Sequence, residues 1–293
     1  MLVYPQGAEQ ALRGDLLLRV VLRTDLTPVP ATLELEVRRT AETVAAVAHG
    51  KVLTVADAEF EIVKTEERRA DDLAQGDRVY TAIRATALLR SCAAIAAPLQ
   101  RSVIRESASL GGIYRACGAT VRIASDFTVP VFAAYVGQTP SFMVAQALQE
   151  EAGVLVVERG RVSFRRLRDL IAAPAGVVVA EDVAEVVESG LLERHAIPFA
   201  FSTVPGSQFV YGRRSAARGF VYRPRADQRI VNNLGTALVL RRKLRNSFSL
   251  DYNAGARVDV GGVRHIAITA AHVFEPRDGG EQYSQFWLGE VTS

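Results

Sequence analysis

The stretch Gln138-Thr-Pro-Ser-Phe-Met-Val-Ala-Gln-Ala-Leu-Gln-Glu-Glu-Ala-Gly153 decides how the middle of this chain folds. Thr139 is a good N-cap residue, and Pro140 fits the first helical position, where a missing amide hydrogen costs nothing. Gly153 stands where a helix commonly ends on a residue of positive φ. The apolar residues at helical spacing are Phe142, Ala145, Leu148 and Ala152. The stretch therefore predicts an amphipathic helix with Phe142 and Leu148 in the core.

A tight hairpin is predicted directly after this helix. Val154-Leu-Val-Val-Glu158 and Arg161-Val-Ser-Phe-Arg-Arg-Leu167 are separated only by Arg159-Gly160, and Gly160 suits the turn. We expect the helix and hairpin to be packed structure rather than a site. The structural residues of this unit are Thr139, Phe142, Leu148, Gly153, Gly160 and Phe164.

Strands dominate the first hundred residues. In Ala31–Arg38 the residues Leu33, Leu35 and Val37 alternate with charged side chains, which is typical of a half-buried strand. Similar strands are predicted at 15–23, 59–63 and 79–89, whereas the polar stretch 65–78 is predicted to be an exposed loop. Several short strands without long helices between them indicate an antiparallel sandwich or barrel.

The spacing of apolar residues changes from strand-like to helical after residue 106 and becomes strand-like again after Pro174. Leu110, Ile113, Tyr114 and Cys117 share one face of a short helix that Gly118 ends. Beyond Pro174 we expect a short helix at 182–189, a turn at Asn232-Asn233, and otherwise strands. The predicted strands lie at 199–203, 208–211, 219–222, 236–240, 257–260, 264–274 and 282–291.

These patterns predict a mainly β fold with an α+β insertion. The first β-barrel-like module covers residues 1–105, the connecting helix–hairpin segment covers 106–173, and the second β-barrel-like module covers 174–293. Either module can be discontinuous in sequence. A chain of 293 residues is long enough for about two ordinary domains.

Composition places the chain among soluble globular proteins, with 49% hydrophobic and 23% charged residues. Cys92 and Cys117 stand among small apolar residues, which favours buried free thiols over a disulfide. The N-terminus lacks the pattern of a signal peptide, and apolar runs such as Ala93–Leu99 are too short to span a bilayer. We expect no membrane insertion by this chain and synthesis in a cytoplasm.

The common catalytic and ligand-binding motifs are missing from the sequence. It contains no G-x-S-x-G, no phosphate-binding glycine loop, no H-E-x-x-H and no C-x-x-C. His265 and His272 are seven residues apart in a predicted strand, so they should face opposite sides and not share a metal. The paired carboxylates, such as Glu150-Glu151, are interpreted as solvated. We therefore expect no catalytic residue, no metal, no cofactor and no enzymatic activity.

One segment has an unusual charge. Residues 207–245 carry ten basic residues and one acid, Asp227, a net charge of +9 in a chain whose total is +3. Tyr211, Phe220 and Tyr222 are interleaved with these cations. The segment suits an acidic protein partner, a nonspecific contact with nucleic acid, or a plain solvated surface. The candidate interaction residues are Arg213, Arg214, Arg218, Arg223, Arg225, Arg229, Arg241, Arg242, Lys243 and Arg245.

The middle of the chain resembles the tail hub proteins of the late control D type and the N-terminal hub of type VI secretion spike proteins. The residues that carry the resemblance are Gln138, Thr139, Phe142, Leu148, Glu150, Glu151 and Gly153, with Val162 and Phe164 on the return strand. The stretches 107–118, 120–123, 255–260 and 262–268 are similar to elements of the same family. Pro140 departs from the pattern, because that position is often acidic or polar.

The resemblance implies a structural virion protein, the central hub of a contractile phage tail baseplate that takes part in genome ejection. It implies a homotrimer whose two barrels per chain adapt a six-fold tail tube to a three-fold spike and line the DNA conduit. The implied partners are a tail tube or distal tail ring protein, a separate spike protein since no spike extension follows Ser293, and DNA in the lumen. Two other hypotheses stay open, a tail-associated cell-wall hydrolase or peptidase and a nonspecific nucleic-acid-binding β protein.

Overall fold

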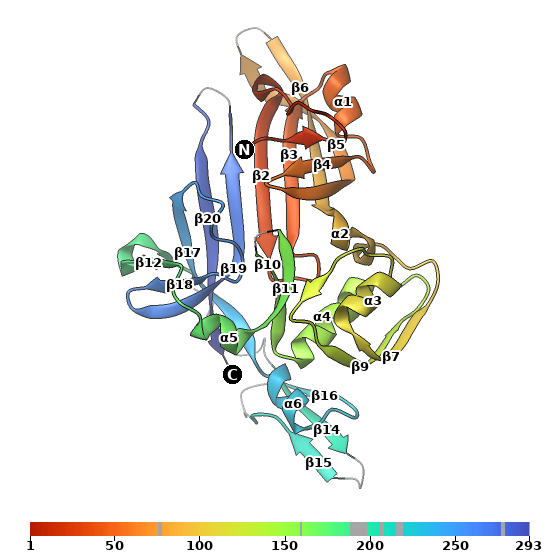
Figure 1. The fold of residues 1–293 in the computed structure, drawn as a ribbon. Coiled ribbons are helices and arrows are strands. Elements are labelled where there is room, and N and C mark those ends of the chain that lie inside the picture. The colour runs from red at the N-terminus through yellow and green to blue at the C-terminus, as the bar shows by residue number, and fades with distance from the viewer. Residues whose placement is uncertain are drawn as a thin grey trace.

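The computed structural model describes residues 1–75, 78–158, 160–187, 198–204, 208–214, 219–276 and 279–292. For residues 69–75, 78–80 and 204 it describes the backbone alone. The chain is mainly β, as the sequence predicts, and its few helices are short. Figure 1 shows β strands of both ends of the chain side by side, a compact α+β part beside them and a small unit that projects at one end.

One large sheet of twelve described strands runs through both β regions. Its main path contains, in spatial order, β1 (Tyr4–Pro5), β4 (Val52–Val55), β5 (Ala58–Gln75), β6 (Arg78–Leu89), β3 (Ala31–Arg38), β2 (Leu17–Asp25), β19 (Val263–Phe274), β20 (Gln282–Thr292), β17 (Ala237–Ser247) and β13 (Glu185–Val186). Off this path, β18 (Arg257–Val260) pairs with β19 and with β12 (Val177–Val179).

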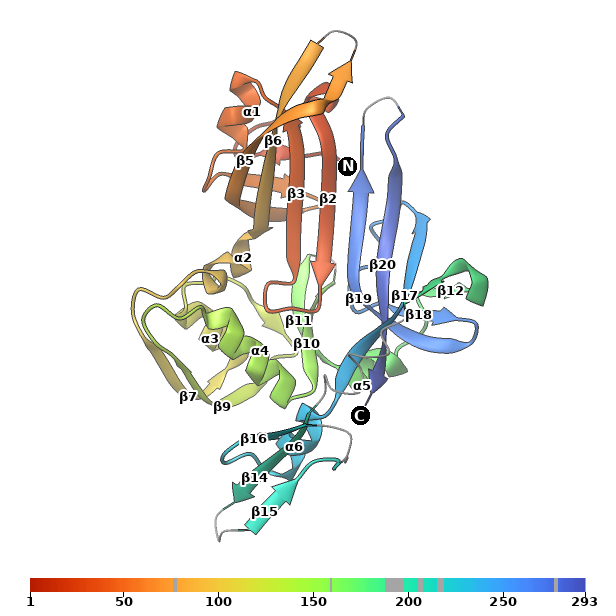
Figure 2. The same ribbon diagram turned by 180° about the vertical axis from the view of Figure 1, so that it is seen from behind.

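The two β regions meet at the antiparallel pair β2 and β19, whose register runs from Asp25 opposite Thr269 to Val20 opposite Phe274. The Thr269 hydroxyl donates a hydrogen bond to Asp25 Oδ1 over 2.6 Å. The two predicted β modules therefore share hydrogen-bonded strands rather than being joined only through the middle segment, and Figure 2 shows the same pairing from behind.

The alternation in β3 works as predicted, because Leu33, Leu35 and Val37 are at most 1% exposed. The expected exposed loop at 65–78 is wrong. There β5 continues to Gln75 and pairs with β6, so the segment is the end of a long hairpin. Residues 64–68 are exposed on both sides of the strand, and a strand that extends beyond the core loses the apolar period that would reveal it.

The remaining elements before residue 190 form small sheets and short helices. The helices are α1 (Ala41–Ala46), α2 (Arg90–Ala93), α3 (Leu110–Ala116), α4 (Pro140–Glu150) and α5 (Leu167–Ala172), with 3-10 turns at Gly14–Leu16, Ala94–Ala96 and Glu181–Val183. The strands are β7 (Val103–Ser109), β8 (Ile123–Ala124), β9 (Thr128–Ala134), β10 (Gly153–Glu158) and β11 (Arg161–Arg166). The helix predicted at 182–189 is wrong, since only the turn and β13 occupy its described part.

Helix α3 forms as predicted and joins the middle segment to the first β region. Ser109 caps it by accepting a hydrogen bond from the Gly112 amide, and its four predicted apolar residues are buried. The Tyr114 hydroxyl donates to the Pro28 carbonyl between β2 and β3 over 2.6 Å. One apolar core, from Val3 to Phe164, extends through the first β region and the middle segment.

Helix α4 begins after Thr139 with Pro140 at its first turn, as predicted, although the Thr139 hydroxyl makes no capping bond. Leu148 is buried at 4% exposure. The expectation that Phe142 is a core residue is wrong, because its side chain is 68% exposed. The buried face instead contains Pro140, Val144, Ala147 and Leu148. Phe142 lies on the exposed side of the helix together with Gln146 and Gln149, so the helix buries the side that carries no glutamine.

The end of α4 also differs from expectation. Positive φ falls on Ala152, at 47°, and not on Gly153. Gly153 is needed for another reason: a Cβ there would lie 2.2 Å from Phe164 Cε2. Phe164 is 5% exposed, so it is a core residue. The hairpin of β10 and β11 forms as predicted, with Gly160 at a φ of 73°.

The described residues between 198 and 236 form a small unit, here called the appendage. Its described strands are β14 (Phe199–Val204), β15 (Gln208–Tyr211) and β16 (Phe220–Tyr222), with β14 in the centre, and its helix is α6 (Gln228–Leu234). The turn predicted at Asn232-Asn233 is wrong, since both residues lie in α6. Asp227 caps this helix by accepting a hydrogen bond from the Ile230 amide. The appendage projects at the lower end of Figure 1.

Candidate interaction surfaces

The structure divides the ten candidate basic residues between two parts of the molecule. Arg213, Arg214, Arg223, Arg225 and Arg229 belong to the appendage, whereas Arg241, Arg242, Lys243 and Arg245 lie on β17 of the large sheet. Arg218 lies outside the described residues. The segment that appears as one basic block in sequence is therefore not one basic patch in space.

Carboxylates at the end of α4 bind two of the appendage arginines. Arg223 Nη2 lies 2.9 Å from Glu150 Oε1. Glu151 accepts from Arg229 on α6 and from Arg166 on β11, each over 2.7 Å. The Glu151 side chain is only 10% exposed. This carboxylate therefore forms a partly buried contact, here called the joint, that connects the appendage with the β10–β11 hairpin. The pair Glu150-Glu151 was interpreted as solvated, and that interpretation is wrong.

The arginines of β17 also meet acids that lie outside the basic segment. Arg242 Nη2 lies 2.9 Å from Glu181 Oε1, and Arg245 Nη2 lies 2.9 Å from Glu281 Oε2. Arg245 also stacks on the Tyr283 ring, with Cζ 3.8 Å from the ring centroid. Folding thus offsets much of the +9 charge that the segment has in isolation.

The described part of the appendage has an exposed aromatic face. Its six rings are those of Phe199, Phe201, Phe209, Tyr211, Phe220 and Tyr222, two from each strand. The register places them side by side, and contacting ring centroids are 5.1 to 6.4 Å apart. The rings of Phe209, Phe220 and Tyr222 come from side chains that are 58%, 69% and 48% exposed. We refer to these six residues as the aromatic face.

Sequence reasoning noted Tyr211, Phe220 and Tyr222 but missed the aromatic face as a unit. The signal was present, because Phe199-Ala-Phe201, Phe209-Val-Tyr211 and Phe220-Val-Tyr222 each repeat an aromatic residue with period 2. Each short run alone fits a buried strand, and only the pairing of the three strands reveals that all six rings share one side.

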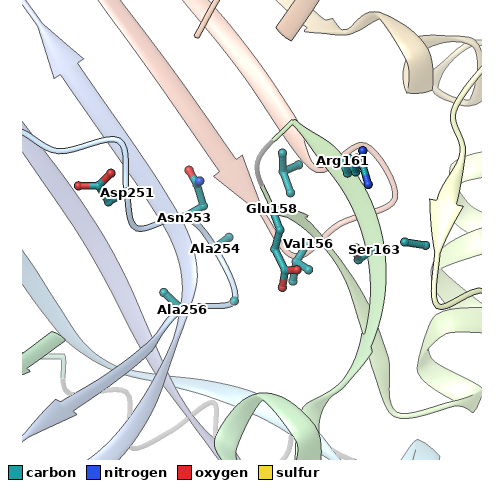
Figure 3. Close-up of a pocket in the computed structure, with 11 residues that line it drawn as sticks. Val156, Glu158, Arg161, Ser163, Asp251, Asn253, Ala254 and Ala256 are labelled. Carbon is teal, nitrogen blue, oxygen red and sulfur yellow. The ribbon is translucent and has the colours of Figure 1, made fainter. Parts of the chain in front are cut away.

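A cavity of about 800 Å³ lies between the β10–β11 hairpin and the loop at 251–256. Figure 3 shows Val156, Glu158, Asp251 and Asn253 among its lining residues. Gly255, at a φ of 94°, lets this loop approach the hairpin, because a Cβ there would lie 2.5 Å from Val156 Cγ1. Both carboxylates already accept hydrogen bonds: Glu158 from Arg165 over 3.0 Å and Asp251 from the Ser249 hydroxyl over 2.9 Å.

Burial shifts the pKa of two titratable groups in the core. Burial raises the pKa of the Cys92 thiol to about 12, and Cys92 and Cys117 are free and buried as predicted. Burial lowers the pKa of His272 to about 4, and its Nδ1 lies 2.9 Å from Ser284 Oγ. Within the described residues no group of three or more His, Cys, Asp or Glu side chains could hold a metal.

No protein-family model and no curated protein matches this sequence. Solved structures do match its fold. The tail protein from Neisseria meningitidis MC58 superposes with a TM-score of 0.61 at 10% identity, covering 99% of this chain and 95% of that chain. The 43 kDa tail protein of prophage MuSo2 from Shewanella oneidensis gives a TM-score of 0.60 at 10% identity, covering 98% and 97%.

The chain has the fold of phage tail proteins. An Escherichia coli component of the type VI secretion system shares it, with a TM-score of 0.54 at 10% identity over 99% of this chain and 77% of that chain. That component is itself described as similar to the T4 bacteriophage tail proteins gp27 and gp5. In the described part of the chain, no helix is long and apolar enough to cross a membrane.

Proposed function

We propose that this chain is a structural component of a phage tail, and specifically the central hub of its baseplate. The observation that carries the proposal is the extent of the fold match. The two superposed tail proteins are covered over 95% and 97% of their own length, so the likeness extends through whole chains and not through one common motif. The helix–hairpin at 138–167, which suggested the hub family from sequence, is present in the fold.

In this proposal three copies form a ring that matches a six-fold tube above to a three-fold spike below. Each chain supplies two β units, residues 1–105 and 174–293, around the connecting segment 106–173. Continuity of the large sheet across β2 and β19 supports this arrangement, because it fixes the two β units relative to one another. A closed ring can also cover exposed sheet edges of its subunits.

The proposed partners are a tail tube or distal tail ring protein, a separate spike protein and DNA passing through the lumen. The chain is made in the host cytoplasm and resides in the virion tail. We propose that it needs no cofactor and performs no catalysis, and that exposed members of the basic set meet acidic surfaces of partner subunits. The pairing of Arg242 and Arg245 with this chain's own acids makes β17 the weaker candidate for such a contact.

Light scattering of the purified chain, alone and mixed with the product of the neighbouring spike gene, tests the hub role. We expect a mass of three copies in at least the mixed sample, and rings with three-fold averages in electron micrographs. A monomer in both samples, or a closed dimer, would overturn the hub proposal. Assays with peptidoglycan, casein and DNA should give background turnover, and hydrolysis that is lost on changing one carboxylate would favour the hydrolase or peptidase hypothesis.

A further inference from the structure

Among the described residues, the appendage sheet is covered on one side only. Its covered side packs on α6 through a small core of Ala200, Ala226 and Val231, each at most 4% exposed. The other side is the aromatic face. Within it the Tyr222 and Thr203 hydroxyls share a hydrogen bond of 2.7 Å, which holds the ring of Tyr222 in place. The face is thus a preformed apolar surface that no described element of this chain covers.

The charged residues of the segment that carries this face have one sign. From residue 198 to residue 226 the sequence contains no Asp, no Glu and no Lys. Arg214 lies over the ring of Tyr211, with Cζ 3.5 Å from the centroid, and Tyr211 is on the outer strand β15, so Arg214 is at the rim of the face. The centre of a protein–protein interface is typically rich in aromatic residues and arginine and poor in Lys, Glu and Asp. The segment that carries the aromatic face has this composition.

The same contacts argue against a polyanion as the occupant. Arg223 and Arg229 are bound to Glu150 and Glu151, and the other described cations of the appendage are Arg213, Arg214 and Arg225. Nucleic acid affinity grows with the number of phosphates that a protein neutralises, and so few cations make a weak and salt-sensitive site. The rings also pack against one another at 5.1 to 6.4 Å rather than standing apart for bases to insert.

We propose that the aromatic face docks a segment of a different protein, one with apolar side chains flanked by carboxylates. The apolar side chains cover Phe209, Phe220 and Tyr222, and a carboxylate pairs with Arg214 at the rim. This docking concerns the appendage alone. It does not depend on the trimer, so a chain that proves to be monomeric can still bind such a segment, and a trimer can form without one.

A displayed random-peptide library, selected on the immobilised full chain, tests this docking. The double variant Phe209→Ser/Phe220→Ser serves for counter-selection. We expect enrichment of peptides that combine Leu, Phe or Trp with Asp or Glu. Binding of the best peptide, measured by fluorescence anisotropy, should weaken at least about ten-fold in the double variant, because these rings would be the centre of the contact. Arg214→Gln should weaken it by up to about five-fold, the limit for an exposed ion pair.

Phe142→Ser is the matched control, because Phe142 is 68% exposed, as Phe220 is at 69%, but lies on α4 outside the face. It should bind the peptide as the parent does, and thermal melting should show that all variants are folded. Absence of face-dependent enrichment, or enrichment of Lys and Arg, would overturn the proposal. So would face-dependent binding of a single-stranded oligonucleotide or of phosphatidylglycerol vesicles in preference to the acidic peptide. Self-association abolished by the double variant would assign the face to a second copy instead.

Discussion

Phe164 and Phe220 both lie in three-stranded sheets, the first on the central strand β11 and the second on the outer strand β16. Phe164 belongs to the body of the molecule, meaning the described residues outside the appendage, and is 5% exposed, whereas Phe220 in the appendage is 69% exposed. The Phe164 ring packs 4.5 Å from that of Phe127, inside the core shared with the first β region. Phe220 packs against Phe199 and Phe201, which lie in the same uncovered layer. Similar side chains on similar sheets therefore have opposite environments.

The difference shows that burial depends on how many layers cover a sheet. The sheet of β10, β11 and β8 lies between the large core, which contains Leu155 and Phe164, and a second cluster that contains Val156 and Leu167. The appendage sheet has α6 on one side and no described layer on the other. A sheet with one covered side needs a partner if its free side is apolar, and this requirement separates the appendage from the body.

Replacing Phe164 and Phe220 by alanine, one at a time, should give the largest difference in the free energy of unfolding. Phe164→Ala is expected to lower the free energy of unfolding by about 3–5 kcal/mol, the usual cost of removing a buried ring. Phe220→Ala should change it by less than about 0.5 kcal/mol, because its side chain is exposed. Urea denaturation followed by circular dichroism measures both. Equal losses would mean that the aromatic face is covered within the chain.

Acid should weaken the body through His272. Its pKa is about 4 in the folded protein, lowered by burial from an ordinary 6.5. The unfolded chain therefore takes up a proton as the pH falls below about 6.5 while the folded chain does not, and stability decreases down to pH 4. The total loss is about 3 kcal/mol. Residues 198–236 contain no histidine, so this effect is confined to the body.

The variant His272→Phe isolates that contribution. Phe248 and Phe286 surround the imidazole with ring centroids 6.4 and 6.3 Å away, and the Ser284 hydroxyl keeps its bond to the Ser249 carbonyl. Carboxylates titrate in parent and variant alike, so the quantity to compare is the difference in unfolding free energy between pH 7.5 and pH 4.5. The variant should lose less stability over this interval than the parent. Identical losses would show that His272 takes up its proton in the folded state.

Substitutions at the end of α4 test why a glycine stands there. Gly153→Ala should cost about 1–3 kcal/mol, because its Cβ would lie 2.2 Å from Phe164 Cε2. Ala152→Gly should be neutral or stabilise by up to about 1 kcal/mol, since it relieves a positive φ on alanine. Thermal denaturation of both variants gives the comparison. The opposite ranking would restore the interpretation in which Gly153 supplies the helix exit.

The joint between body and appendage should give the smallest effect. Glu151→Gln weakens the contacts to Arg166 and Arg229, whose side chains are 38% and 52% exposed, so we expect a loss of about 1 kcal/mol. Limited proteolysis should cut next to the appendage faster in this variant. Glu158→Gln is the matched control, because Glu158 forms one exposed pair with Arg165 and should leave the digestion rate unchanged.

The sequence was sufficient to predict the elements whose pattern of apolar and charged residues shows which side is buried. Strand β3 alternates Leu33, Leu35 and Val37 with charges, and α3 carries its apolar residues on one face, so each pattern has a single interpretation. Helix α4 carries apolar residues on two sides, and the choice of Phe142 over Val144 was wrong because Gln146 and Gln149 share the side of Phe142. In α6 the Asp227 cap was a usable signal, but the pair Asn232-Asn233 suggested a turn.

The candidate interaction surface was harder to predict, because a run of basic residues in the sequence does not show which carboxylates pair with them in the folded protein. Arg223 and Arg229 meet carboxylates 73 and 78 residues away. The pairing of three short strands also decides that six rings share one side, and no local pattern contains that register. Residues close in sequence could be assigned to an element, whereas contacts distant in sequence could not.

The pairing of β2 with β19 sets an order of events while the protein is being made. Thr269 and Asp25, which share a hydrogen bond there, are 244 residues apart, so the ribosome releases β2 long before its partner strand exists. Until then the outer edge of β2 presents unpaired amide and carbonyl groups, to which an edge of another nascent chain can bind. Closing so long a loop is also slow. Strand β19 is thus the one that ends this risk of aggregation for β2.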